Sequence, residues 1–134
     1  MIAVITGDII NSRKGEVERW IGPLKETLNR YGVEPKNWEI YRGDSFQLSL
    51  APEKAVIAAL HIKATIKQTK LQDIRMAIGI GEEKYRSPKI TEANGSAYAN
   101  SGMCFEAMKK QTLAIKSGNK NLDQSLNTMF NLSL

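Results

Sequence analysis

The run IAVIT at residues 2–6 restricts the fold of this chain more than any other segment. Successive side chains of a strand point to opposite faces, and in this run both faces are apolar. A strand of that kind belongs inside a sheet, with other parts of the protein packed on both sides. We therefore expect a central strand near the N-terminus, which ends at Gly7-Asp8.

Residues 38–51 predict a β-hairpin with one polar face. In SFQLSLA (45–51) apolar and polar residues alternate, which is typical of an antiparallel strand covered on one side. WEIYR (38–42) supplies the other strand. Gly43 and Asp44 lie between them and suit a two-residue type II′ turn, which takes glycine first. This turn places a carboxylate, Asp44, at the tip of the hairpin.

The other segments complete an alternating order of elements. Apolar residues at helical spacing run from Val17 to Tyr31, where Pro23 predicts a kink or a restart and Gly32 a stop. A second helix is expected after Pro52. The remaining elements are a strand at 74–82, a helix at 95–110, a strand at 112–116 and an apolar helical face at 121–134.

The predicted order is β-α-β-β-α-β-α-β, and its first six elements match the split βαβ, or ferredoxin-like, topology. We expect an α+β fold with a palm-type antiparallel sheet and helices on one face. The domain spans residues 1–118, and residues 119–134 form a C-terminal helix. This helix has three alternatives: it docks on its own domain, pairs with another copy, or leads to a further region.

Composition limits the class of protein. The chain has 134 residues and one cysteine, Cys104, which allows neither an intrachain disulfide nor a zinc site of cysteines. We expect no signal peptide, because Asp8 interrupts the N-terminal apolar run too early, and no apolar run is long enough for a membrane span. We therefore expect a cytoplasmic protein without membrane contact. The net charge of +5 is scattered, which suits either a phosphate-bearing ligand or plain solubility. No helix-turn-helix is present, and direct nucleic-acid binding by this chain alone is not expected.

Asp8 and Asp44 are the candidate catalytic and metal-binding residues. In the split βαβ topology, the end of the first strand and the hairpin turn meet at one edge of the sheet. Two uncompensated carboxylates in contact raise one pKa or bind a cation. Mg²⁺ with a nucleoside triphosphate suits such a pair, because Mg²⁺ takes one or two carboxylates plus phosphate oxygens. The alternative is that both aspartates only form turns, since an Asp side chain readily bonds nearby backbone amides.

The segments TGDIINSR and YRGDSFQLSL resemble the paired signatures of the SatD family of bacterial proteins. Both segments in turn resemble the palm domains of class III nucleotidyl cyclases and GGDEF diguanylate cyclases. RMAIGIGE (75–82) is similar to the glycine-bearing strand that follows the second helix in those domains. The resemblance covers residues 1–116.

This resemblance implies a nucleotide site. Asp8, Asp44 and the main-chain carbonyl of Ile9 match the metal ligands, and the ion would be Mg²⁺ or Mn²⁺. The implied reaction is nucleotidyl transfer or cyclisation on a nucleoside triphosphate. Related cyclases complete their sites across a dimer, which suggests a homodimer. The residues expected to contact the nucleotide are Ile9, Ser12, Arg13, Arg42, Gly43 and Asn100.

The chain also departs from these families. Ser45 stands where a GGDEF domain has a second acidic residue. Class III cyclases carry Asn-x-x-x-Arg on a later helix, whereas here Asn100 is one place out of register and Cys104 replaces the arginine. Loss of such a cation slows phosphoryl transfer by orders of magnitude, unless Arg13, Lys14 or Arg42 replaces it. The alternative function is therefore a catalytically inactive sensing or dimerisation module of a bacterial regulatory protein, related to transcription.

Overall fold

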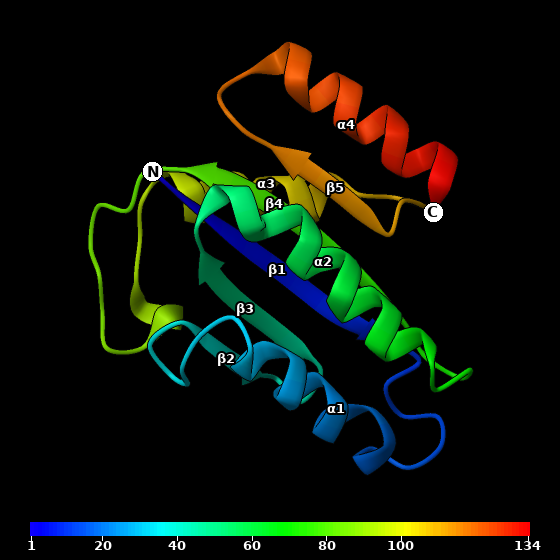
Figure 1. Cartoon of the computed structure of the whole chain (residues 1–134). Coiled ribbons are helices and arrows are strands. Elements are labelled where there is room, and N and C mark those ends of the chain that lie inside the picture. The colour runs from blue at the N-terminus through cyan, green and yellow to red at the C-terminus, as the bar shows by residue number, and fades with distance from the viewer.

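The chain folds into a mixed five-stranded sheet with helices on both faces (Figure 1). The computed structural model describes all residues from 1 to 134. The strands are β1 (Ile2–Ile10), β2 (Trp38–Tyr41), β3 (Ser45–Leu50), β4 (Asp73–Gly81) and β5 (Leu113–Lys116). The helices are α1 (Glu18–Asn29), α2 (Pro52–Lys67), α3 (Ser96–Ala107) and α4 (Lys120–Ser133), with a short 3-10 helix, η1 (Ile90–Glu92), before α3.

The strand order is β2-β3-β1-β4-β5, so β1 lies at the centre of the sheet. β1 pairs antiparallel with β3 and β4, and β2 pairs antiparallel with β3. These four strands and α1 and α2 form the predicted split βαβ unit. β5 adds to the edge in parallel with β4, which makes the sheet mixed. The α+β fold class predicted from the sequence is confirmed.

The main core lies between the sheet and helices α1 and α2, which cover the near face in Figure 1. Alternate residues of each strand point into it, as the period of two requires. Its largest fully buried side chains are Ile5, Trp20, Leu24, Leu28, Trp38, Phe46, Leu48, Ile62, Ile66, Ile74, Met76 and Ile78.

Helix α3 covers the opposite face, behind β4 in Figure 1. It approaches β4 so closely that a Cβ atom at Gly79 would lie 2.5 Å from the Ala97 carbonyl oxygen. The Thr6 and Ser101 hydroxyls are hydrogen-bonded at 2.7 Å beneath the helix. The helices therefore do not all lie on one face, and the cover on both faces explains why Val4 is buried as fully as Ile5.

Three local expectations differ from the structure. β1 extends to Ile10 because both neighbouring strands pair with it past Gly7, so Asp8 lies within the strand and not after it. The hairpin loop has three residues, 42–44, between the paired Tyr41 and Ser45, with positive φ at Arg42 (55°) and Gly43 (85°), and it is not the expected two-residue type II′ turn at Gly43-Asp44. Pro23 lies inside α1, which is a single helix and does not restart there.

Helix α4 packs against β5 and inserts Phe130 into the main core. Its Asn127 side chain accepts a hydrogen bond from the Ile115 N–H (2.8 Å) and donates one to the Ile115 carbonyl (3.0 Å). Asp123 accepts a bond from the Ser117 N–H at 2.9 Å. The helix thus lies along the outer edge of β5. None of the helices has the length and apolar character that crossing a membrane would require.

Candidate functional site

A row of four polar side chains crosses the sheet on the face that carries α3. Tyr41 on β2 is paired with Ser45 on β3, Ser45 with Asp8 on β1, and Asp8 with Arg75 on β4. Residues paired directly across antiparallel strands point to the same face. All four side chains are half-buried. The predicted site residue Asp8 therefore lies in the middle of a polar row that ends in an arginine.

Arg75 neutralises Asp8. The Arg75 Nε donates to Asp8 Oδ1 at 3.4 Å and Nη2 donates to Oδ2 at 3.3 Å, so both carboxylate oxygens are engaged. The guanidinium also stacks on the Phe105 ring of α3, with its central carbon 4.4 Å from the ring centroid. The sequence-based expectation of an uncompensated carboxylate at Asp8 is wrong, because the register of β1 and β4 brings a cation to it.

Asp44 lies beside the next residue of β1. Its main-chain carbonyl accepts a hydrogen bond from the Ile9 N–H at 2.9 Å. The reciprocal bond, from the Asp44 N–H to the Ile9 carbonyl, is not formed. The Asp44 carboxylate accepts a hydrogen bond from the Ser12 hydroxyl at 2.8 Å through Oδ2. The two acidic residues are thus one strand position apart at the same end of the sheet, with different side-chain partners.

The segment after β1 holds Ser12 in position. The indole Nε1 of the buried Trp20 donates to the Ser12 carbonyl at 3.1 Å. The Gln72 amide donates to the carbonyls of Asn11 (3.0 Å) and Lys14 (2.6 Å). Ser12 does not cap α1, which has no side-chain cap. Its hydroxyl instead orients the Asp44 carboxylate.

The predicted cations near the hairpin are exposed. The Arg42 guanidinium carbon lies 5.8 Å from the Tyr41 ring centroid. Neither Arg42 nor Arg13, in the segment after β1, forms an ion pair within 4 Å. A Cβ atom at Gly43 would meet nothing within 4 Å, so the turn leaves open space. Burial raises the pKa of Tyr41, while the Arg42 cation lowers it and the Asp8 carboxylate raises it.

Asn100 lies at the other end of the sheet. Its amide donates to the Ile80 carbonyl at 2.9 Å, and Ile80 pairs with Ala3. Arg75, beside Asp8, is five positions back along β4, which corresponds to about 17 Å of strand. Within one copy of the chain, Asn100 therefore does not join the aspartates.

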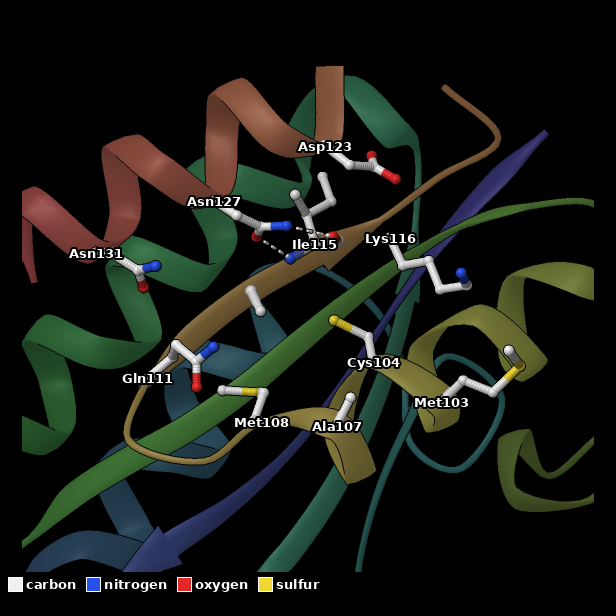
Figure 2. A pocket seen from close by; sticks show the side chains of 11 residues that line it. Met103, Cys104, Ala107, Met108, Gln111, Ile115, Lys116, Asp123, Asn127 and Asn131 are labelled. Carbon is white, nitrogen blue, oxygen red and sulfur yellow. Dashed lines mark hydrogen bonds between the residues drawn. The ribbon is translucent and has the colours of Figure 1, made fainter. Parts of the chain in front are cut away.

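Cys104 lines a groove of about 430 Å³ between α3, β5 and α4, where Figure 2 shows its sulfur above Met108 and Ala107. Burial raises the pKa of the Cys104 thiol to about 11, the Asp123 charge adds to this and the Lys116 charge opposes it. The thiol is therefore protonated and uncharged at neutral pH.

Sequence reasoning missed Arg75 and its support on Phe105. Arg13, Lys14 and Arg42 lie near the two aspartates in the sequence, whereas Arg75 is 67 residues from Asp8. A signal did exist, because strand alternation in residues 74–82 separates Arg75 from the core-facing Ile74 and Met76. Only the register with β1 shows that this cation faces Asp8.

The donors at this end of the sheet suit a hard divalent cation. Two carboxylates and the main-chain carbonyl of Ile9 are oxygen ligands, which Mg²⁺ prefers. The chain has no cluster of three or more histidine, cysteine or acidic side chains placed to hold a metal.

No protein-family model matches the sequence, and comparison with curated proteins finds no relative. Comparison with solved structures finds a similar fold in a bacterial light-regulated adenylyl cyclase, with a TM-score of 0.57. This chain has a cyclase-like palm fold. The match covers 85% of this chain and 74% of that chain at 17% sequence identity. At so low an identity the likeness establishes the fold and nothing about activity.

Proposed function

We propose that this chain binds a nucleoside triphosphate together with Mg²⁺, or Mn²⁺, at the end of the sheet that carries Asp8 and Asp44. One observation carries the proposal: the Ile9 N–H bond to the Asp44 carbonyl holds the two acidic residues at adjacent strand positions. It occurs in a fold shared with an adenylyl cyclase. The resemblance of TGDIINSR and YRGDSFQLSL to the SatD family and to class III and GGDEF cyclases supports the same proposal.

Each residue has a distinct part in the proposed site. Asp8, Asp44 and the Ile9 carbonyl hold the ion, and Ser12 fixes the Asp44 carboxylate by its 2.8 Å hydrogen bond. Arg42 is exposed at the turn and contacts phosphate oxygens, and Gly43 leaves them space. A bound ion of this kind offsets charge on phosphate and lowers the pKa of an attacking hydroxyl, the chemistry of nucleotidyl transfer or cyclisation.

A second function is a binding module without turnover. Asn100 is engaged with the Ile80 carbonyl, and the Cys104 thiol is protonated where a cyclase has an arginine. Such a chain would sense a nucleotide, or dimerise, as part of a regulatory protein related to transcription.

Calorimetric titration of ATP and GTP, with and without Mg²⁺, tests the proposal. We expect metal-dependent binding that is lost in Asp8→Asn and in Asp44→Asn. Glu26→Gln is the matched control, because it removes one exposed negative charge from α1. Equal binding by the wild type and an Asp8→Asn, Asp44→Asn double variant would refute the metal site. Chromatography after a long incubation then separates the two functions: a new nucleotide product indicates an enzyme, and unchanged nucleotide indicates a sensor.

A further inference from the structure

We infer that Arg75 is an exchangeable counter-ion, which pairs with Asp8 in the metal-free protein and passes to the triphosphate when a metal ion takes Asp8. This inference rests on the proposed function and adds a residue that couples the two ligands. Arg75, on β4, would supply the cation for which the class III motif has an arginine at the position of Cys104 on α3.

The first step is competition. Arg75 engages both oxygens of Asp8, so an ion on this carboxylate would place a second positive charge beside the guanidinium and weaken the ion pair. The contacts of 3.3 and 3.4 Å are longer than the roughly 2.7–2.9 Å of tight charge-assisted hydrogen bonds. Both side chains are 30% exposed, and ion pairs so open to solvent are weak. The pair is therefore strong enough to neutralise Asp8 and weak enough to be replaced.

The second step is support for Arg75 once Asp8 has been taken. The Phe105 ring lies under the guanidinium, and this cation–π contact does not involve Asp8. The arginine backbone is fixed within β4 by its pairing with β1. The guanidinium would consequently stay beside Asp8 and could bind phosphate there. Its planar fork of donors is suited to phosphate.

Arg75 differs from the other cations of the site because it has a carboxylate partner. Arg13, Lys14 and Arg42 are exposed and form no ion pair within 4 Å. They can attract phosphate but do not compete with a metal ion for a carboxylate. Only Arg75 changes partner when both ligands are present. Metal and triphosphate should therefore bind cooperatively, and the coupling must be reciprocal.

The test measures free Mn²⁺ by electron paramagnetic resonance during titration of the protein, first with Mn²⁺ alone and then with a non-hydrolysable triphosphate. The wild type is compared with Arg75→Gln and Asp8→Asn. Arg30→Gln is the matched control, because Arg30 is exposed at the end of α1 and has no acidic partner within 4 Å. Circular dichroism and a thermal melt check folding. If Arg75→Gln does not fold, Arg75→Met replaces it, because the Met side chain keeps an apolar contact with Phe105.

We expect Arg75→Gln to bind Mn²⁺ alone at least about fivefold more tightly than the wild type, because the competing cation is gone. The triphosphate should strengthen Mn²⁺ binding by about tenfold or more in the wild type and in Arg30→Gln, and by much less in Arg75→Gln. The role of Arg75 would be refuted if Arg75→Gln bound Mn²⁺ with wild-type affinity and the triphosphate strengthened that binding as much as in the wild type. Loss of Mn²⁺ binding in Asp8→Asn would then leave the proposed site intact. Mn²⁺ binding that is absent from the wild type, or unaffected by Asp8→Asn, would refute the proposed site itself.

Discussion

The Asn127 side chain makes both of the hydrogen bonds that a neighbouring strand would make to Ile115 (Figure 2). β5 is an edge strand, and an open edge offers unpaired backbone groups to other chains. The carboxamide of Asn127 satisfies one such pair, because it carries a donor and an acceptor at one point. α4 therefore covers the β5 edge of the sheet through the polar side chain of Asn127 as well as through the buried Phe130.

Asn127→Asp should destabilise the protein. The substitution removes the donor to the Ile115 carbonyl and sets a carboxylate against it, at an expected cost of about 1–3 kcal/mol in the free energy of unfolding. Asn131→Asp is the control, because Asn131 is exposed on the same helix and makes no hydrogen bond through its side chain. Urea denaturation followed by circular dichroism measures both variants. Equal midpoints for the two would contradict this role of Asn127.

Gly79→Ala should weaken the packing of α3 on β4. A Cβ at this position would lie 2.5 Å from the Ala97 carbonyl oxygen, and backbone cannot give way as a flexible side chain can. We expect a loss of about 1–3 kcal/mol. Gly102 lies within α3, and a Cβ atom there would meet nothing within 4 Å. Gly102→Ala should therefore stabilise α3 by about 0.5–1 kcal/mol. Equal effects of the two substitutions on thermal unfolding would show that α3 does not pack as described.

Much of the sheet could be predicted because its signal is local. The apolar character of residues 2–6 on both faces requires cover on both sides, and Val4 and Ile5 are indeed both buried. The end of β1 could not be predicted, because Gly7-Asp8 has a low strand propensity. Pairing with β3 and β4 on both sides overrides that propensity, as cross-strand packing often does.

The site was predicted less completely, because its contacts are non-local. Asp8 and Asp44 were found by motif, and their neighbouring positions follow from the hairpin topology. The pairing of Asp8 with Arg75 depends on the register of two strands far apart in the sequence. The conformation of the hairpin loop could not be predicted because it has a positive φ at Arg42, which is uncommon for residues other than glycine.

Asp73 should make stability depend on pH in the acid range. Burial alone would raise its pKa, but hydrogen bonds from the Ile74 N–H and from Lys63, with the charges of Lys63 and Lys67, outweigh burial and hold the pKa below its usual value. A lowered carboxyl pKa stabilises the fold above the unfolded pKa of about 3.9, and this contribution is lost as the pH falls through the lower folded value. Asp73→Asn should therefore be less stable than the wild type at pH 7, and the difference should shrink below pH 4. A pH-independent difference in urea midpoint would be inconsistent with this pairing.

Cys104 should react slowly with thiol reagents at neutral pH. With its pKa raised to about 11, mainly by burial, the thiolate fraction is on the order of 100-fold below that of an ordinary cysteine. We expect the rate of reaction with iodoacetamide to rise steadily from pH 7 to pH 10. Asp123→Asn removes a nearby negative charge and should lower the pH at which the thiol reacts. A rate at pH 7 equal to that of free cysteine would contradict the described burial.

The location of the metal site can be tested directly by nuclear magnetic resonance, with sub-stoichiometric Mn²⁺ and a non-hydrolysable triphosphate added to isotopically labelled protein. A bound paramagnetic ion broadens the amide signals of nearby residues. We predict selective loss of the signals of Ile9, Ser12 and Asp44. The signal of Asn100 should persist, because Asn100 contacts β4 about five residues along the strand from the position beside Asp8. Broadening centred on any other part of the chain, or no selective broadening at all, would contradict a metal–nucleotide site at Asp8 and Asp44.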